Sequence, residues 1–156
     1  MMRNHVSQAS VNQPNLYDRD YSLWLQTTAN KLRERKFSEV DVENLADEIE
    51  SMGRREKSAL SSNLQVVLMH LLKYRYQPNK RTNSWLLTIF EHRDPVGEAL
   101  ELSPSLKPYL EEIFSKCYSK ARKKAALETG LPIDSLKKNS PFTLEETLDV
   151  DYLPED

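Results

Sequence analysis

The feature that most restricts the fold is a run of apolar residues at helical spacing in the middle of the chain. The run consists of Leu60, Leu64, Val67, Leu68, Leu71 and Leu72. Intervals of three and four residues place such side chains on one side of an α-helix. Pro78 and Asn79 follow, and they predict the end of this helix near residue 77. We expect the helix to be central to the fold and Leu68 to be among the most buried residues.

The same periodicity predicts two helices before the central one. The first covers residues 18–36. Ser38 is expected to cap the second, with Asp41 three residues later favourable near the positive end of the helix dipole. The predicted inner face of the second helix is formed by Val42, Leu45, Ile49 and Met52. Gly53 is a potential break before the central helix, although the apolar period continues without a loop.

A fourth helix is predicted to begin at one of three polar residues, Thr82, Asn83 or Ser84. Its inward-facing residues are expected to be Trp85, Leu86, Ile89 and Phe90. Pro95 either kinks this helix after Arg93 or begins a new short one, because proline is tolerated in the first helical turn and disruptive in later ones. The periodicity alone does not choose between these two outcomes.

Two more helices complete the predicted fold. The fifth covers residues 106–129 and ends at Gly130, and Thr143 with Glu146 forms a capping box for a short terminal helix. The fold class is therefore all-α: a single-domain irregular bundle of about five main helices plus a short C-terminal helix. We expect this helical domain to span residues 16–154 and residues 1–15 to form a disordered leader.

Composition and charge narrow the location and the partners. The only cysteine is Cys117, which cannot form an intramolecular disulfide and favours a reducing compartment. Residues 1–15 do not look like a secretory signal, and no apolar run approaches the length of a membrane span. We therefore expect a soluble, cytoplasmic protein without a membrane partner. A formal net charge of −2 provides no general argument for binding nucleic acid.

Short motifs with a known chemical mechanism are absent from the sequence. Three glycines leave no phosphate-binding loop, and one cysteine with three histidines does not match zinc or di-iron spacing. We expect no metal and no cofactor. The residues that could carry chemistry are instead polar side chains beside apolar stripes.

Glu48, His70 and Arg93 are the candidate catalytic residues, because an acid, an imidazole and a guanidinium in a helical core could form a general acid/base site. The alternative is structural. Arg93 lies within an apolar stripe and needs a partner there, and Glu48 is the first candidate, Glu128 the second and Asp41 the third. We favour the structural interpretation, since buried charges are usually paired and few such pairs are catalytic.

A second group of residues is basic and lies around the turn at Pro78. Its candidate nucleic-acid-binding residues are Lys73, Arg75, Lys80 and Arg81, which alternate with Tyr74 and Tyr76. Aromatic rings and cations in such a pattern suit single-stranded nucleic acid. The other interpretation is a solvated helix end, where lysine and arginine are favourable near the negative pole of the dipole. We favour this second interpretation because the chain is slightly acidic.

Four blocks of the sequence form an ordered pattern: DVENLADEIESMG (41–53), HLLKYRYQPNKRTNSW (70–85), IFEHR (89–93) and PFTLEETLDVDYLP (141–154). In this order they resemble the family of domain of unknown function 29. The resemblance extends from about Tyr17 to Pro154, with Tyr74 where the family often has tryptophan. It implies a helical fold and carries over no catalytic residues.

The sequence thus leaves three functions open. The preferred one is a small helical module that binds another macromolecule, with protein as the expected partner. The leading alternative is an enzyme of the hydrolase or nuclease type that uses Glu48, His70 and Arg93. The third is a nucleic-acid binder without catalytic activity.

Overall fold

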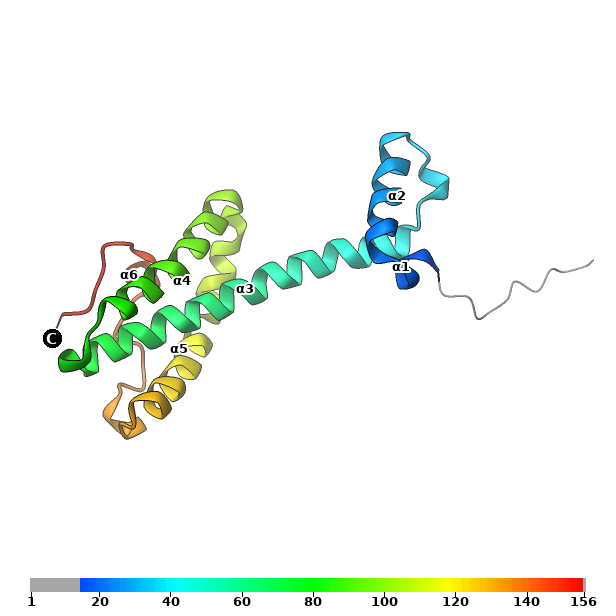
Figure 1. Cartoon of the computed structure of the whole chain (residues 1–156). Coiled ribbons are helices and arrows are strands. Elements are labelled where there is room, and N and C mark those ends of the chain that lie inside the picture. Colours follow the sequence, from blue (N-terminus) through cyan, green and yellow to red (C-terminus); the bar gives the residue numbers. More distant parts are fainter. Residues whose placement is uncertain (1–14, 156) are drawn as a thin grey trace, which may run out of the picture. The chain divides into compact units, whose positions relative to one another are not determined.

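The computed structural model describes residues 15–155, and their regular secondary structure is entirely helical (Figure 1). The predicted all-α class is therefore confirmed. The chain divides into two compact units, the N-terminal unit (residues 1–52) and the C-terminal unit (residues 53–156). The predicted disordered leader lies outside the described residues except for Asn15, which caps the first helix. The assignment of residues 16–154 to a single domain stays a prediction.

The longest helix is α3 (Val42–Tyr76), which joins two segments that the sequence predicted as separate helices. Gly53 lies inside it and does not break it. The helix begins one turn later than Ser38, which lies in the 3-10 turn Phe37–Glu39. Asp41 is the capping residue instead, because its Oδ1 accepts the backbone N–H of Asn44 at 3.2 Å.

The N-terminal unit contains α1 (Leu16–Arg19) and α2 (Tyr21–Arg33). Asp20 separates these helices and caps α2 by accepting the backbone N–H of Leu23 at 3.0 Å. The interior is aromatic: the ring of Tyr17 meets the ring of Trp24 edge to face, with 4.7 Å between centroids. Trp24 is only 4% exposed.

The first turns of α3 do not bury the face that the sequence predicted to be internal. Val42, Ile49 and Met52 are each about 60% exposed. The neighbouring side of the helix is covered instead, since Glu48 is buried and accepts a hydrogen bond from Tyr17 at 3.1 Å. The prediction of an inner face at these three residues is therefore wrong.

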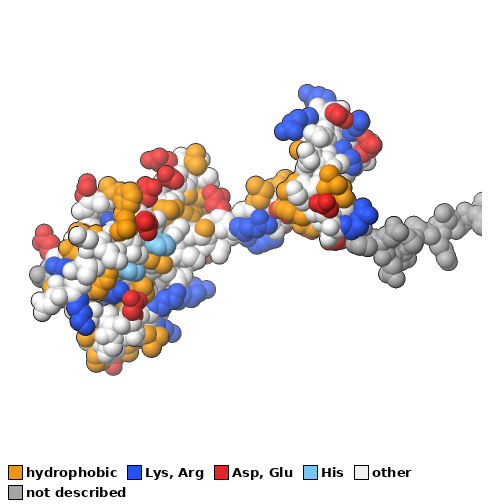
Figure 2. All heavy atoms as spheres, in the orientation of Figure 1, with side chains coloured by type: hydrophobic (Ala, Val, Ile, Leu, Met, Phe, Trp, Pro, Cys, Tyr) orange, Lys and Arg blue, Asp and Glu red, His pale blue; other side chains and the backbone are white. Residues whose placement is uncertain are grey.

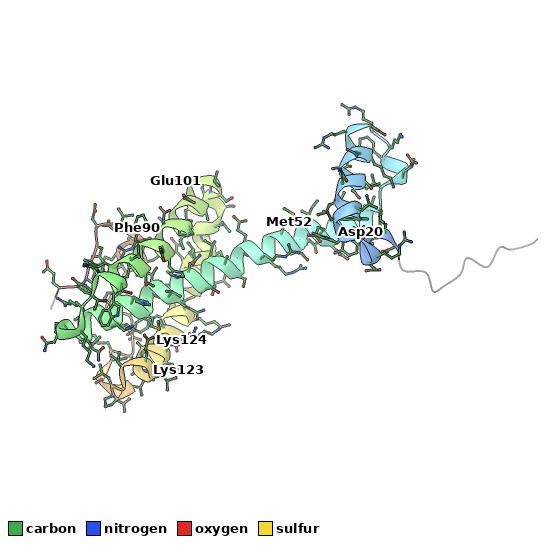
Figure 3. The ribbon with its side chains drawn as sticks, viewed as in Figure 1. Asp20, Met52, Phe90, Glu101, Lys123 and Lys124 are labelled. Atoms are coloured by element: carbon green, nitrogen blue, oxygen red, sulfur yellow. The ribbon has the colours of Figure 1, made fainter. Side chains whose placement is uncertain are left out.

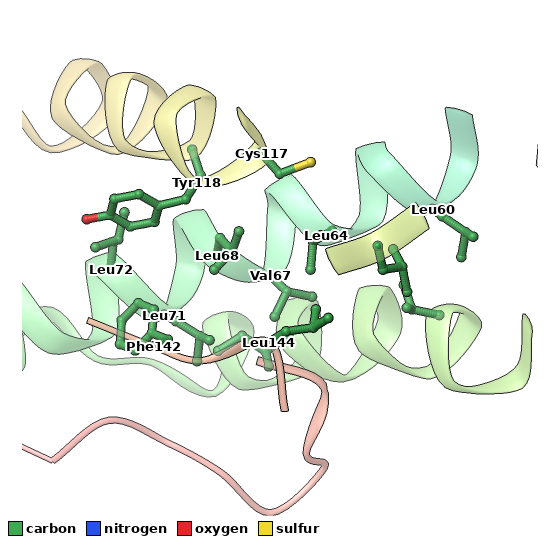
Figure 4. Close-up of a cluster of buried hydrophobic side chains, with 14 of the residues drawn as sticks. Leu60, Leu64, Val67, Leu68, Leu71, Leu72, Cys117, Tyr118, Phe142 and Leu144 are labelled. Carbon is green, nitrogen blue, oxygen red and sulfur yellow. The ribbon is translucent and has the colours of Figure 1, made fainter. Parts of the chain in front are cut away.

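The C-terminal unit is built around the remainder of α3. It adds α4 (Asn83–Leu102), α5 (Lys107–Thr129) and α6 (Leu144–Leu148), with 3-10 turns at Pro78–Lys80, Pro104–Leu106 and Ile133–Ser135. The predicted leucine-rich face of α3 is its core, and five residues have no exposed surface: Leu64, Val67, Leu68, Leu71 and Leu72. Cys117 and Tyr118 of α5 lie on one side of this face, and Phe142 and Leu144 lie on another (Figure 4).

Helix α4 continues through Pro95, so of the two predicted outcomes the start of a new helix is wrong, and a kink at this position stays a prediction. Thr82 caps it by accepting the backbone N–H of Trp85 at 3.3 Å. Of the residues predicted to face inward, Ile89 is buried, but Phe90 is 60% exposed and Leu86 is 37% exposed. That part of the prediction is wrong, and α4 presents an apolar surface to solvent.

The predicted end of α5 and the predicted start of α6 are both confirmed. Gly130 follows α5 with φ of 74°, the left-handed conformation that glycine adopts without a steric penalty. Thr143 and Glu146 form both hydrogen bonds of the capping box at the start of α6. No helix within residues 15–155 is long and apolar enough to cross a membrane.

We expect Leu68→Ala to lower the free energy of unfolding by about 2–5 kcal/mol, because it removes buried methyl groups and leaves a cavity. Leu102→Ala is the matched control, since Leu102 is 85% exposed. It should change stability by less than about 0.5 kcal/mol. Chemical denaturation of both variants measures the difference, and equal losses would contradict the central position of Leu68.

Candidate functional site

Arg93 is the least exposed cationic residue among the described residues of the C-terminal unit, at 3%. Its Nε donates to the backbone carbonyl of Thr147 at 2.9 Å, and its Nη2 donates to that of Tyr152 at 3.1 Å. The sequence predicted a carboxylate partner, with Glu48 first. The hydrogen-bond partners of Arg93 among the described residues are instead two main-chain oxygens of the C-terminal segment.

Arg93 therefore holds residues 147–152 against α4. Burial lowers the pKa of Arg93 from its ordinary value, and the negative charge of Asp149 opposes that shift. An arginine side chain nevertheless stays protonated in proteins, so its donors are always available. Two carbonyls accept the charge-assisted hydrogen bonds, and the bond to Thr147 is fully buried. The contact fixes the position of the C-terminal segment.

A groove of about 290 Å³ lies where this segment meets α4. Its lining residues are Leu86, Ile89, Phe90, Arg93, Asp94, Val150, Asp151 and Leu153. Phe90 and Val150 are exposed by 60% and 67%, so the groove has an open apolar rim. Figure 2 shows orange side chains on this face of α4, where Figure 3 marks Phe90, with acidic side chains beside them. We call this feature the α4 groove.

A second hollow adjoins the α4 groove, since both are lined by Asp151 and Leu153. The second hollow has a volume of about 610 Å³ and is lined in addition by Arg75, Glu146, Asp149, Tyr152 and Glu155. Its lining thus contains four carboxylates and one cation. Burial raises the pKa of Tyr152, and the negative charge of Glu146 raises it further. We call this feature the acidic hollow.

His70 and Lys73 belong to a separate polar cluster on α3. The Nζ of Lys73 lies 2.6 Å from Oε1 of Glu128 and 4.6 Å from the centre of the Trp85 ring. The Nδ1 of His70 lies 2.9 Å from the carbonyl of Val66. A carbonyl oxygen only accepts, so Nδ1 carries the proton and Nε2 keeps its lone pair when the ring is neutral.

The environment of His70 favours that neutral form. Burial lowers the pKa of His70, the hydrogen bond to Val66 raises it, and the positive charge of Lys73 lowers it. The nearby His92 is half-buried and lies with its Nδ1 2.8 Å from Oδ1 of Asn63. Two imidazoles and a lysine are therefore gathered here, but none of them lines the α4 groove or the acidic hollow.

Glu48, the third catalytic candidate, belongs to the N-terminal unit. It accepts hydrogen bonds from the hydroxyls of Tyr17 and Tyr21. The hydrogen bond and the burial raise the pKa of Tyr17. His70 and Arg93 lie in the C-terminal unit, and each of the three candidates has different hydrogen-bond partners. Their proposed catalytic role stays a hypothesis. No group of three or more metal-ligating side chains occurs among residues 15–155.

The basic residues at the Pro78 turn are held in different ways. Lys73 is buried at 6% exposure, whereas Lys80 is exposed. Arg81 stacks 4.1 Å above the ring of Tyr74 and donates from Nε to its carbonyl at 2.8 Å. Arg75 lies 5.9 Å from the ring of Tyr76 and also lines the acidic hollow. Binding of nucleic acid by these four residues stays a prediction.

Sequence reasoning did identify Arg93 and Lys73, but not the groove beside Arg93. The missed residues are Leu86, Phe90 and Val150, the first two of which were assigned to the core. One feature of the sequence could have indicated the groove: the apolar Val150 lies among the many acidic residues of the segment 145–156. The carbonyl acceptors of Arg93 could not be predicted from the sequence, because every residue carries a backbone carbonyl.

The described residues thus form an all-helical protein with a surface groove beside Arg93. The family model described as Domain of unknown function DUF29 matches residues 16–153. The chain therefore belongs to that family, and the resemblance drawn from its sequence blocks is confirmed. No curated protein and no solved structure matches the chain.

We expect Arg93→Leu to destabilise the C-terminal unit by about 3–5 kcal/mol, because the carbonyls of Thr147 and Tyr152 lose charged hydrogen-bond donors worth about 1.5–3 kcal/mol each. Arg122→Leu is the matched control. Arg122 also donates from Nε and Nη2 to two carbonyls, those of Leu136 and Ile133, but is only half-buried. Its loss should cost less, since water can replace the guanidinium. Denaturation and limited proteolysis near residues 147–152 provide the measurements, and equal losses for the two variants would contradict the role of burial.

The lowered pKa of His70 predicts a loss of stability in acid. The unfolded ring binds its proton at the ordinary value of 6.5 and the folded ring at a lower one. The stabilising contribution is therefore fully present above pH 6.5 and decreases as the pH falls through the folded pKa. His70→Gln should flatten this part of the stability profile. Imidazole titration by nuclear magnetic resonance tests the sign, and a His70 midpoint at or above 6.5 would contradict it.

Proposed function

We propose that the chain is a helical module that binds another protein through the α4 groove. The observation that carries this proposal is the open apolar rim of Phe90 and Val150 over a groove with a buried floor at Ile89. Exposed apolar residues that gather around a hollow are characteristic of protein interaction sites. Such a groove is suited to one large apolar side chain of a partner, with adjacent partner residues on the rim.

The charge around the groove favours a partner segment with Lys or Arg beside its apolar anchor. Asp94 and Asp151 line the groove itself, and three further carboxylates line the adjoining acidic hollow. The two hollows share Asp151 and Leu153, so one short segment could occupy both. Opposite charges would increase the association rate and select against acidic partners.

Arg93 contributes to this function by holding one wall of the groove in place. It keeps the C-terminal segment in place through Thr147 and Tyr152, and the groove therefore exists before a partner arrives. A preformed groove reduces the conformational entropy that binding would otherwise cost. The guanidinium is thus assigned a structural role in a binding site.

A hydrolase or nuclease is less well supported as an alternative. Nε and Nη2 of Arg93 each donate to a main-chain carbonyl, and Glu48 accepts from two tyrosines in the N-terminal unit. The remaining candidate, His70, has an Nε2 that could act as a base. It lines neither of the two hollows in which a substrate would meet the other polar groups described above.

A nucleic-acid binder is also less well supported. Arg75 shares its hollow with four carboxylates, and Lys73 is buried against Glu128. An anionic backbone would be repelled by the first arrangement and could not reach the second. For location we propose the cytoplasm, because the single cysteine, Cys117, has no second cysteine in the chain with which to form a disulfide, which favours a reducing compartment.

We expect a labelled peptide with Leu and Phe between lysines and arginines to bind with a Kd on the order of 10–100 µM. A peptide of the same length and apolar residues, with glutamates in place of the cations, should bind at least about tenfold more weakly. Fluorescence anisotropy at two salt concentrations provides the measurement. The cationic peptide should bind more weakly at the higher concentration, because salt screens the acidic rim.

Two variants locate the binding. Phe90→Ser should reduce affinity for the cationic peptide by about tenfold or more, since the anchor loses its apolar contact. Leu102→Ser is the control, because Leu102 is an exposed apolar residue of the same helix outside the groove lining. Equal affinity of the parent chain and Phe90→Ser, or equal binding of both peptides, would contradict the proposed site and its charge preference.

A further inference from the structure

The last turns of α5, in the C-terminal unit, carry an exposed leucine among lysines. Leu127 is 85% exposed, and Lys123 and Lys124 are exposed one turn before it. Lys116 and Lys120 continue the same line, because intervals of three and four residues fall on one side of a helix. Figure 2 shows blue and orange side chains on this part of the molecule, where Figure 3 marks Lys123 and Lys124. We call Leu127 with these four lysines the α5 surface.

A hollow of about 450 Å³ lies beside Leu127, and it is lined by Lys123, Ala126, Leu127, Leu131 and Ile133. Gly130 ends α5 in the left-handed conformation, and the chain then packs against the helix. Arg122 holds this segment, because its Nη2 donates to the carbonyl of Ile133 at 2.8 Å and its Nε to that of Leu136 at 3.1 Å. The hollow is therefore a fixed part of the surface.

The positive charge of the α5 surface is not neutralised within the described chain. Three of its lysines have neither an ion pair nor a hydrogen bond among residues 15–155: Lys116, Lys120 and Lys123. Lys124 donates to the neutral side chain of Gln65 at 3.4 Å. Glu128 follows Leu127, but its carboxylate pairs with Lys73. Two other carboxylates lie beyond the ends of the surface, those of Glu112 and Asp134.

The α4 groove and the acidic hollow have the opposite charge. Asp94 and Asp151 line the groove, which has room for one apolar side chain in its volume of about 290 Å³. The acidic hollow extends the groove on the side of Asp151 and adds three carboxylates: Glu146, Asp149 and Glu155. The same chain thus carries an apolar anchor among lysines and an apolar groove among carboxylates. Surfaces with such opposite potentials favour association with each other.

The two surfaces face different sides of the C-terminal unit. Figure 1 and Figure 4 both show α4 and α5 on opposite sides of α3. Both helices bury residues in the core around α3, which fixes their positions relative to each other. No residue lines both the α4 groove and the hollow beside Leu127. A contact between the two surfaces therefore requires two copies of the chain.

We propose that Leu127 of one copy binds in the α4 groove of a second copy. This inference rests on the proposed function, because it assigns the partner of that groove. The register that places the anchor also places the charges. The lysines extend from Leu127 on one side only, at about 5 to 16 Å along the helix axis. The acidic hollow likewise extends from the groove on one side, so the lysines lie along it.

The exposed rim of the α4 groove has a matching place on the other copy. Phe90 is 60% exposed at that rim, and the hollow beside Leu127 is apolar apart from Lys123. When Leu127 enters the groove, Phe90 therefore faces Ala126 and Leu131 of the other copy. Each copy thus provides one apolar side chain and one hollow, which makes the contact reciprocal in shape and opposite in charge.

A contact between two different surfaces leaves one of each free at the ends of the pair. Further copies can then add in a row, or the row can close into a ring. One anchor with its adjoining lysines is at the low end of interface sizes. We therefore expect a reversible association with a Kd on the order of 100 µM. It should weaken as salt is added, because the charges that contribute to it are exposed.

Sedimentation velocity of the full chain across a concentration series measures the association. The average mass should rise with concentration, and Leu127→Ser should shift that rise to at least about tenfold higher concentration. Leu102→Ser is the matched control, because Leu102 is also an 85% exposed leucine and lies outside both surfaces. A parent chain with one-chain mass throughout, or an equal effect of the two variants, would overturn the inference. Circular dichroism should show unchanged helix content in both.

Charge reversal tests the role of the lysines. Lys123→Glu with Lys124→Glu should shift the rise in mass at least about as far as Leu127→Ser does, since like charges then meet at the groove. Lys137→Glu with Lys138→Glu is the control, because it reverses two adjacent exposed lysines of the same unit outside the α5 surface. Equal shifts for the two double variants would show that net charge, rather than this contact, governs the association.

Mixing two variants tests whether the contact joins different surfaces. Leu127→Ser keeps the groove, and Phe90→Ser keeps the anchor. Neither variant should associate alone at concentrations where the parent chain does. Their mixture should form two-chain complexes and no larger ones, because each complex uses the only intact anchor and the only intact groove. One-chain mass in the mixture would overturn the proposed pairing of surfaces.

Anisotropy with the cationic peptide separates this inference from the proposed function. Leu127→Ser should bind the peptide as the parent chain does, since its α4 groove is unchanged. The same peptide should lower the average mass of the parent chain, because it competes with Leu127 for the groove. Peptide binding without any association of the parent chain would overturn the inference alone. Absence of both would overturn the proposed function as well.

Discussion

The C-terminal unit depends on the burial of one face of α3, from Leu60 to Leu72. The residues of this face have almost no exposed surface, and α4, α5 and the C-terminal segment all contribute side chains to cover it. Burial of that much apolar surface is the main favourable contribution to folding. It is not directional, however, because leucine-rich faces tolerate more than one way of sliding past each other. Other contacts must select the register.

Two buried polar groups of this unit provide that selection, and each is satisfied by a different kind of partner. Arg93 donates to two carbonyls of the C-terminal segment, and Lys73 pairs with Glu128 and lies over the ring of Trp85. A misplaced helix would leave one of these groups buried without a partner, at a cost of several kcal/mol. No buried polar side-chain atom among residues 15–155 lacks a hydrogen-bond partner. Polar satisfaction thus complements apolar burial in specifying the unit.

Much of the fold was predictable from sequence because helices are local. The intervals of three and four residues from Leu60 to Leu72, the capping box at Thr143 and the left-handed Gly130 each depend on neighbours within a turn. It was not predictable which apolar face of each helix would be buried by another segment of the chain. A helical wheel shows that Val42, Ile49 and Phe90 are on an apolar face, but not whether another segment covers it. The candidate site was missed for the same reason, and Arg93 was recognised as needing a partner while its carbonyl acceptors were not.

The two uncovered apolar surfaces have different physical settings, and this difference determines what each can do. The α4 groove has a rigid floor in the C-terminal unit, so a bound segment adds contacts to a structure that is already stable. Val42, Ile49 and Met52 lie in a unit whose interior is mainly Trp24 with Tyr17 and Glu48, so a segment that covered these three residues would also stabilise the unit itself by mass action.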